Sequence, residues 1–237
     1  MKRSAVILSI AIISFLSFTY GVLTVQYQIF PYEIIRSTNN LVLGASDSRS
    51  PHYSHKKSFF EVFGQGDYDI VFIGDSITEN AEWADLFPEY KIANRGIGGD
   101  TSSGILERID SIKSTNADKA FIMVGINDLN RGISVNSVFE NYSRVVEELQ
   151  SSGFKIYIQS TILGGSRISG VNNSIKSLNN KLKDLAGNSE GITYIDLNEH
   201  LVKSGSLSAD FTQDDMHLNG SGYKAWKNSI SEYVRSD

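Results

Sequence analysis

Short apolar runs alternate with amphipathic stretches along most of the chain, beginning near Tyr68. The runs lie at Ile70–Ile73, Lys91–Ala93, Ala120–Val124, Lys155–Gln159 and Ile192–Ile195. Between them, apolar residues recur with helical spacing, as at Val138, Tyr142, Val145, Val146 and Leu149, and again at Ile175, Leu178, Leu182 and Leu185. Alternating strands and helices predict a parallel sheet covered by helices on both faces. The sequence therefore predicts an α/β fold, a three-layer α/β/α sandwich with a five-stranded parallel sheet of flavodoxin-like type.

The N-terminal segment has a different pattern. Lys2 and Arg3 are followed by an uncharged stretch that lasts until Glu33, and the apolar part from Ala5 to Val25 has about the length that spans a bilayer. Positive charge before such a span predicts a cytoplasmic N-terminus and a domain on the far side of the membrane. A cleaved signal peptide is the alternative, but Thr19-Tyr20-Gly21 is a poor cleavage site. Both interpretations place the folded domain outside the cytoplasm, and the first is favoured.

These patterns divide the chain into three parts: a transmembrane signal anchor or signal peptide over residues 1–30, a linker over 31–66 and a folded domain over 67–237. Residues Arg36 to Ser58 are rich in Ser, Asn and charge, as expected of a spacer. His52 and His55 lie within it. Two histidines at this spacing can bind a metal, but no third ligand is near in sequence, so a solvated linker is the preferred interpretation.

Composition narrows the possible functions. The chain has 237 residues, a formal net charge of -5 and no cysteine. This length fits one domain with a full-size core. The acidic balance gives no sign of a nucleic-acid partner, for which a basic face is expected. The absence of cysteine excludes disulfides and thiolate metal sites.

Polar segments follow several of the predicted strands. They are Gly74-Asp75-Ser76, "NRGIGGDTSSG" over 94–104, Gly125-Ile126-Asn127-Asp128, and "DDMHLNGSGY" over 214–223 after the last strand. Right-handed crossovers place the carboxyl ends of all parallel strands at one edge, where ligands bind in such sheets. We therefore expect the four segments to meet at that edge.

Each segment alone has an unremarkable explanation. Ser76 can be a helix cap, Gly96 to Gly99 a turn or a phosphate cradle, and Asn127-Asp128 a turn. The stretch from Asp214 to His217 can be a solvated loop or part of a metal site.

Together, the segments hold the groups that acyl transfer needs. A serine hydroxyl needs a base within hydrogen-bond reach, an imidazole serves near neutral pH, and a carboxylate orients it. Asp214 and His217 are three residues apart, so one turn can bring both side chains to the same side. The oxyanion needs fixed donors, which a glycine N–H and an asparagine amide provide.

The four segments resemble the four blocks of the GDSL esterase/lipase family, also called SGNH hydrolases. The blocks are "FIGDSIT", "NRGIGGDTS", "VGIND" and "DDMHLNGSGY", in the family's order, and the resemblance runs from about Tyr68 to Val234. Through "GIGGDT" the chain is most similar to the subgroup of platelet-activating-factor acetylhydrolase.

The resemblance implies a role for each matched residue. Ser76 is implied as the nucleophile, His217 as the base and later acid, and Asp214 as the residue that orients His217. Asp215 is the alternative partner if the loop is wound differently. Gly99 and Asn127, with the backbone N–H of Ser76, are implied as the oxyanion hole. Asp75 is expected to be a turn acceptor, and no metal or organic cofactor is implied.

Three functions follow as hypotheses. The first is hydrolysis of an acyl ester outside the cytoplasm, either an O-acetyl group on a glycan or a lysophospholipid or thioester. The second is acyl transfer to a sugar with the same residues. The third is a non-catalytic carbohydrate-binding module, which has no need of an aligned Ser–His pair. Arg167, in the segment from Ser160 to Asn173, can contact an anionic or sugar substrate, but a solvated arginine is the preferred interpretation.

Overall fold

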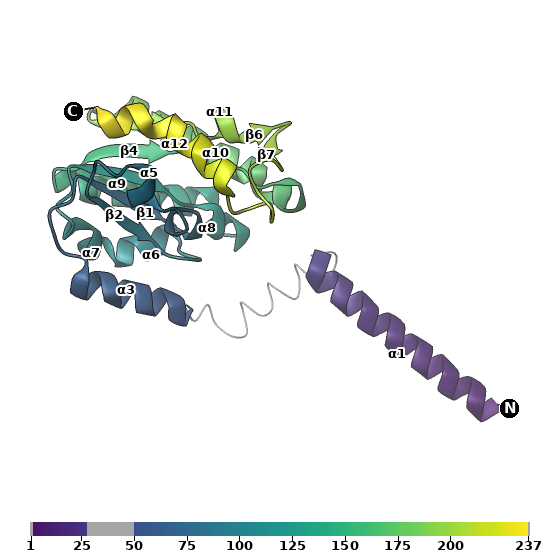
Figure 1. Ribbon diagram of the computed structural model, residues 1–237. Helices are drawn as coiled ribbons and strands as arrows, with labels where there is room; N and C mark the ends of the chain where they lie inside the picture. Colours follow the sequence, from purple (N-terminus) through teal and green to yellow (C-terminus); the bar gives the residue numbers. More distant parts are fainter. Residues whose placement is uncertain (1, 28–49, 237) are drawn as a thin grey trace. The chain divides into compact units, whose positions relative to one another are not determined.

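The computed structural model describes residues 2–27 and 50–236 (Figure 1). The chain divides into two compact units, Met1–Arg49 and Ser50–Asp237. The first unit contains helix α1 (Lys2–Tyr27). Among the residues that the structure describes, no helix is both long and apolar enough to cross a membrane. The predicted transmembrane anchor is thus not supported, and the part of the predicted linker before residue 50 lies outside the described residues.

A five-stranded parallel sheet forms the centre of the second unit. Its strands are β1 (Ile70–Gly74), β2 (Ile92–Gly96), β3 (Lys119–Met123), β4 (Lys155–Gln159) and β5 (Ile192–Ile195). Their order in the sheet is β2-β1-β3-β4-β5, and every neighbouring pair is parallel. This is the flavodoxin-like order, in which the chain reverses its direction of travel across the sheet between β1 and β3. The predicted α/β/α fold with five parallel strands is confirmed.

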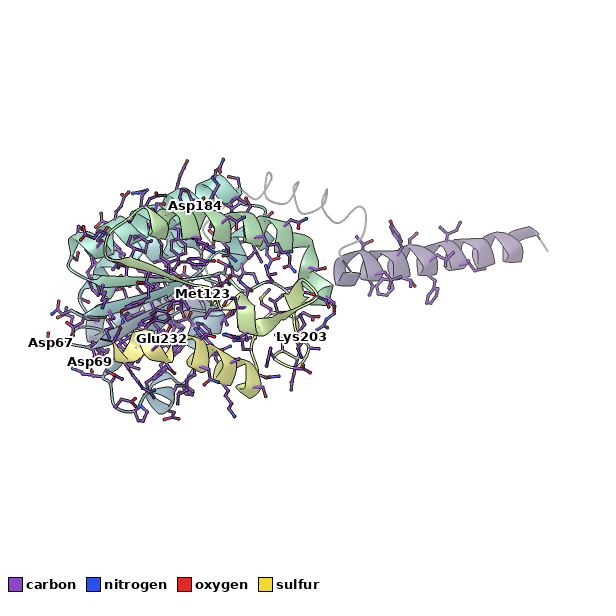
Figure 2. All side chains as sticks on the ribbon, turned by 90° about the horizontal axis from the view of Figure 1, so that it is seen from above. Asp67, Asp69, Met123, Asp184, Lys203 and Glu232 are labelled. Carbon is purple, nitrogen blue, oxygen red and sulfur yellow. The ribbon has the colours of Figure 1, made fainter. Side chains whose placement is uncertain are left out.

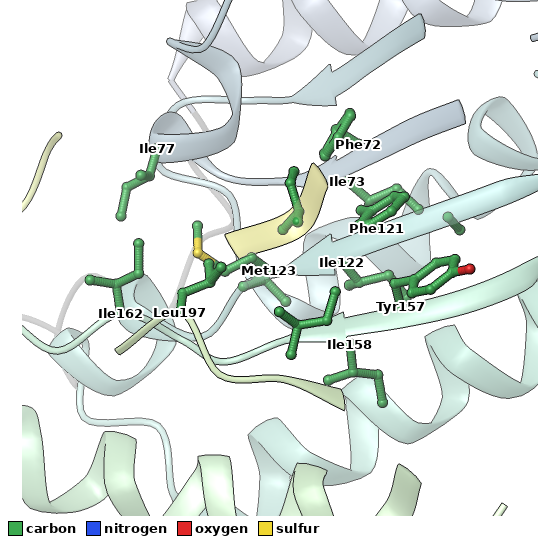
Figure 3. Packing of buried hydrophobic residues seen from close by; sticks show 14 of the residues in the cluster. Phe72, Ile73, Ile77, Phe121, Ile122, Met123, Tyr157, Ile158, Ile162 and Leu197 are labelled. Carbon is green, nitrogen blue, oxygen red and sulfur yellow. The ribbon is translucent and has the colours of Figure 1, made fainter. Parts of the chain in front are cut away.

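A row of stacked aromatic rings lies on one face of the sheet. The sheet register pairs Phe72 with Phe121 and Phe121 with Tyr157, and the ring centroids are 5.0 Å and 4.5 Å apart (Figure 3). Trp83 of α5 (Trp83–Leu86) stacks on Phe72, and Trp226 of α12 (Gly220–Arg235) meets Trp83 edge-on at 5.1 Å. Cross-strand aromatic pairs stabilise a sheet beyond the area they bury. These contacts fix α5 and α12 to this face.

Three helices cover the opposite face: α6 (Ser102–Glu107), α9 (Val135–Ser151) and α10 (Asn172–Gly187), with α9 between the other two. The helical spacing noted in the sequence marks the buried side of α9, where Tyr142 also donates to the carbonyl of Ile122 over 2.8 Å. Figure 2 shows Asp184 of α10 and Glu232 of α12 on opposite sides of the sheet, with Met123 of β3 between them. The three layers follow from this arrangement.

The remaining elements are short and connect the layers. They are α4 (Ser76–Glu79), α7 (Ile109–Lys113), α8 (Ile126–Asn130), the 3₁₀ helix η1 (Ser166–Val171), α11 (Asn198–Leu201) and the antiparallel pair β6 (Val202–Lys203) and β7 (Ser206–Leu207).

The predicted linker is wrong for residues 50–66, because a helix of the folded unit lies there. Helix α3 (Pro51–Phe63) starts with Ser50, whose side chain accepts from the N–H of Tyr53, and with a proline at its first position. Both are strong helix-start signals. Tyr53 and Phe60 are buried and form a small cluster with Ile97. Only two residues of α3 are buried. Because so few positions pack against the domain, the segment has the composition of a spacer although it is a helix of the folded unit.

Candidate active site

Ser76 stands where the first strand ends and helix α4 begins. The strand can turn here because Gly74 has no side chain: a Cβ on it would lie 2.2 Å from Oγ1 of Thr78 and 2.4 Å from the carbonyl oxygen of Met123. Asp75 caps α4 by accepting the N–H of Ile77 at 3.0 Å, which agrees with its expected role in the turn. As the first residue of α4, Ser76 has an N–H without an acceptor inside the helix.

His217 brings an imidazole to the hydroxyl of Ser76. Its Nε2 lies 2.9 Å from Oγ of Ser76, and its Nδ1 lies 2.6 Å from Oδ2 of Asp214. Oδ1 of Asp214 accepts the backbone N–H of His217 at 2.7 Å and that of Met216 at 3.0 Å. The carboxylate therefore holds both the ring and the backbone of the loop, and the three side chains form one continuous chain of hydrogen bonds.

The carboxylate of Asp214 is well suited to orient a histidine. Partial burial raises the pKa of Asp214, but the hydrogen bonds from the ring and backbone of His217 and from Met216 outweigh it, so the pKa lies well below its usual range. Asp214 thus stays ionised at neutral pH and favours the proton of His217 on Nδ1. In that tautomer Nε2 is free to accept the proton of Ser76.

The neighbouring carboxylate has a different partner. Asp215 pairs with Nε of Arg167, and Arg167 also donates to the carbonyl of Gln213 over 3.3 Å. Of the two candidates that the sequence left open, Asp214 contacts His217. Arg167 is exposed, and its guanidinium is engaged by the loop that carries the histidine.

Gly99 and Asn127 reach the same edge of the sheet from the ends of β2 and β3. Gly99 has a φ of +75°, a conformation that glycine adopts without strain. Its carbonyl accepts Nη2 of Arg131 at 2.7 Å. The amide of Asn127 donates to the carbonyl of Asp100 over 3.0 Å. An asparagine amide has two N–H groups, so this bond fixes the side chain and leaves a second donor for a ligand.

Two buried groups hold the loop after β2: Asp128, which the sequence suggested only as part of a turn, and Arg108, which it did not single out. Asp128 accepts the N–H of Ser102 at 3.0 Å and its hydroxyl at 2.7 Å, which ties the start of α6 to α8. Burial raises the pKa of Asp128, while its bonds to Ser102 lower it. Arg108 donates from Nε to Asp100 over 2.8 Å. No sequence pattern pairs these residues, because each contact joins different elements.

Helix α12 ties the histidine loop to the serine helix. The hydroxyl of Tyr223 donates to the carbonyl of Ile77 over 2.8 Å, and Nε1 of Trp226 donates to Gln159 over 2.6 Å. Tyr223 was part of the fourth block, but nothing in the sequence showed this contact.

Three histidines lie outside the Ser76–His217–Asp214 chain. His52 pairs with Glu79, and His55 and His200 are exposed on α3 and α11. The described residues include no group of three or more His, Cys, Asp or Glu side chains that could hold a metal ion.

Comparison with known proteins agrees with the sequence blocks. The model of the GDSL-like Lipase/Acylhydrolase family matches residues 72–225. An N-acylneuraminate cytidylyltransferase of Streptococcus agalactiae is 26% identical over 164 residues, which are 69% of this chain and 38% of that protein. This chain thus spans well under half the length of that relative. The platelet-activating factor acetylhydrolase IB subunit alpha2 of Homo sapiens is 25% identical over 65% of this chain and 71% of its own length.

Solved structures share the fold. A GDSL-like lipase of Bacteroides thetaiotaomicron superposes with a TM-score of 0.68 over 77% of this chain and 96% of its own, at 22% identity. The acetyl xylan esterase AlAXEase superposes with a TM-score of 0.60 over 70% of this chain and 98% of its own, at 22% identity. The resemblance seen in the sequence is confirmed, and this chain belongs to the GDSL-like lipase/acylhydrolase family.

Proposed function

We propose that this protein is a serine esterase that cleaves a small acyl group from a sugar. The observation that carries the proposal is the aligned chain from Oγ of Ser76 through His217 to Asp214, with separations of 2.9 Å and 2.6 Å. A helix cap needs no imidazole, whereas a serine nucleophile needs a base within this distance. The family match supports the same reaction class.

The reaction follows from the positions of these groups. Oγ of Ser76 attacks the ester carbonyl carbon while Nε2 of His217 takes the hydroxyl proton. The ester C–O bond then breaks, and His217 gives that proton to the leaving alkoxide. Water then attacks the acyl carbon while Nε2 of His217 takes its proton. The bond between the acyl carbon and Oγ of Ser76 breaks as His217 returns that proton to Oγ, which releases the acid and the free serine. The oxyanion of each tetrahedral intermediate is bound by the N–H groups of Ser76 and Gly99 and by the amide of Asn127.

The chemical class of the substrate rests on relatives. One solved neighbour is named an acetyl xylan esterase, and one relative is named an acetylhydrolase. Both names describe removal of acetyl groups, the first from a polysaccharide. An O-acetyl group on a glycan is therefore the substrate class that we infer, ahead of a lysophospholipid or a thioester.

A panel of p-nitrophenyl esters of rising chain length, assayed beside acetylated oligosaccharides, tests the proposal. The acetyl esters should be cleaved fastest, and Ser76→Ala should lose roughly 10³-fold or more of the turnover while its circular dichroism spectrum is unchanged. Ser151→Ala, at an exposed serine ending α9, is the matched control. A Ser76→Ala variant that keeps more than about a tenth of the turnover contradicts the serine mechanism. A preference for long acyl chains contradicts the acetyl substrate alone.

The same assay separates hydrolysis from acyl transfer. An acetylated donor is incubated with an unacetylated oligosaccharide, and mass spectrometry follows the products. Free acetate without acetylated acceptor is expected for an esterase.

The location outside the cytoplasm stays a prediction from Lys2, Arg3 and the apolar stretch behind them. Cell fractionation followed by protease treatment of intact cells tests it. The prediction allows a periplasmic or an extracellular domain, so protease should digest it in intact cells or, where an outer membrane encloses it, in spheroplasts. Resistance in spheroplasts until they are lysed contradicts the prediction.

A further inference from the structure

The carboxylate of Glu79 joins three elements of the site. Glu79 is the last residue of α4, three residues after Ser76, and its side chain is 15% exposed. Its Oε2 accepts the backbone N–H of Gly98 at 2.6 Å. Its Oε1 lies 3.0 Å from Nε2 of His52 and 3.1 Å from Nζ of Lys56, one turn apart on α3. One side chain therefore links the serine helix, the loop after β2 and helix α3.

The loop that Glu79 holds is the one that presents Gly99. Gly98 and Gly99 are adjacent, so the N–H that Glu79 binds belongs to the peptide unit immediately before the one that carries the N–H of Gly99. Two glycines in succession have more backbone freedom to lose than any other pair. A hydrogen bond from a charged acceptor is stronger than a neutral one. The bond from Gly98 to Glu79 thus restricts the orientation of the next peptide.

Helix α3 also contacts the loop directly. Tyr53 and Phe60 pack against Ile97, the residue before Gly98, and the hydroxyl of Tyr53 donates to the carbonyl of Gly104 over 3.1 Å. Partial burial raises the pKa of Glu79, but the bonds from His52, Lys56 and Gly98 outweigh it, so the pKa lies below its usual value. Glu79 is therefore ionised at neutral pH, and His52 and Lys56 hold its carboxylate against the loop.

We propose that Glu79 is a positioning residue for the oxyanion hole, which fixes Gly98 and so aims the N–H of Gly99, and that His52 and Lys56 of α3 hold Glu79 in place. The proposal rests on the proposed ester hydrolysis, in which Gly99 donates to the oxyanion. It adds to the active site a helix that lies before the matched family segment, since α3 ends at Phe63 and the match begins at residue 72.

Kinetics of Glu79 variants test the catalytic part. Glu79→Ala should lower kcat roughly ten- to hundredfold, because a small misplacement of a catalytic donor has an effect of that size. KM should change little, since the donor acts mainly in the transition state. Glu79→Gln keeps an oxygen that can accept from Gly98 and should retain more kcat than Glu79→Ala. The matched control is Glu61→Ala, which removes an exposed pairing with Lys57 on the same helix and should leave kcat unchanged.

Amide hydrogen exchange measured by NMR tests the positioning without an activity assay. In the wild type the N–H of Gly98 should be protected, and in Glu79→Ala it should exchange faster, with smaller changes around β5. Unchanged exchange at Gly98 overturns the proposal, as does a Glu79→Ala variant with wild-type kcat in an active preparation. A fall in kcat that only reflects a smaller folded fraction, measured by thermal unfolding, overturns it too. If the wild type cleaves no ester, the proposed function fails, and the exchange experiment still decides whether Glu79 holds the loop.

Discussion

The guanidinium of Arg108 donates from Nε to Oδ2 of Asp100 over 2.8 Å, and both side chains are almost completely buried. Nη2 of Arg108 also donates to the carbonyl of Arg95 over 2.7 Å and to that of Gly74 over 3.3 Å. One cation thus holds together the end of β1, the end of β2 and the residue after Gly99. The ion pair lies directly behind the candidate oxyanion hole.

Removing one partner of this pair should destabilise the domain strongly. Arg108→Met removes the cation that pairs with the buried carboxylate of Asp100, and loss of one partner of a buried ion pair typically lowers the free energy of unfolding by about 3–5 kcal/mol. Urea unfolding of the purified variant measures the change. The control is Lys203→Met, which breaks a pair with Asp210 whose side chains are both about two-thirds exposed, and which should change stability by less than about 1 kcal/mol. Equal changes in the free energy of unfolding for the two substitutions would show that the buried Arg108–Asp100 pair stabilises the domain no more than an exposed pair does.

Asn127→Ala should reduce kcat with little change in KM. The amide of Asn127 is fixed by its bond to Asp100, and loss of one oxyanion donor typically costs about 2.7–4 kcal/mol, a hundred- to thousandfold decrease in turnover. Asn180→Ala, at an exposed position of α10, is the matched control. Because Asn127 also bonds to the loop, kcat, KM and thermal unfolding are measured on one preparation. A variant that is less stable, yet works at full rate in its folded fraction, would assign Asn127 to the turn alone.

Asp75→Asn should change how stability depends on pH. Burial raises the pKa of Asp75 to about 7, although the bond from the N–H of Ile77 lowers it. In the unfolded chain this carboxyl has a pKa near 3.9. Between about pH 4 and pH 7 the folded protein therefore binds more protons at Asp75 than the unfolded chain does, and this contribution makes stability fall as pH rises.

An asparagine at position 75 keeps the oxygen that accepts from Ile77 but does not titrate. The free energy of unfolding of Asp75→Asn, relative to the wild type, should thus rise steadily from pH 4.5 to pH 7.5. Urea unfolding at four pH values in this range measures it, with Asp184→Asn on the exposed side of α10 as control. Parallel stability curves for Asp75→Asn and the wild type would refute the raised pKa.

The folded domain should require residues from Ser50 onward. A chain that begins at Ser50 keeps α3 and should unfold in the same way as residues 50–237 of the full chain. A chain that begins at Asp67 loses Phe60, whose ring lies 4.7 Å from the guanidinium carbon of Arg95, and exposes Ile97. Loss of a buried phenylalanine alone typically costs 3–5 kcal/mol, so this shorter chain should be at least about that much less stable. Urea unfolding of both chains measures their free energies of unfolding. Equal values would show that α3 does not stabilise the domain.

The sequence predicts well those features that repeat locally. Strands β4 and β5 lie where their apolar runs are, and the helical spacing around Tyr142 marks the buried side of α9. Strand β2 extends further than its apolar run, because Asn94 and Arg95 lie inside it. The amide of Asn94 bonds to carbonyls of α4, and Arg95 stacks on Phe60, so both polar side chains have partners that no pattern reveals.

The same distinction, between features with a local sequence pattern and contacts between separate elements, applies to the candidate site. Motif spacing marks Ser76, Asp214 and His217 as candidates, and the structure places their side chains in contact. Their supports were missed: Glu79 with His52, Arg108 with Asp100, and Tyr223 with Ile77. Each of these pairs joins separate elements through one or two hydrogen bonds. Such contacts depend on how the elements pack against one another. Residue types and local spacing do not reveal that packing.

In the proposed mechanism, the hydrogen bond between Ser76 and His217 also determines when activity can first appear during synthesis of the chain. The two residues are 141 positions apart in the chain, so a ribosome that adds about 5–20 residues per second reaches the histidine roughly 7–28 seconds after the serine. Throughout that interval the nascent chain carries a serine without its base. In that mechanism a chain that ends before residue 217 has no base for Ser76, so esterase activity depends on synthesis of nearly the whole domain.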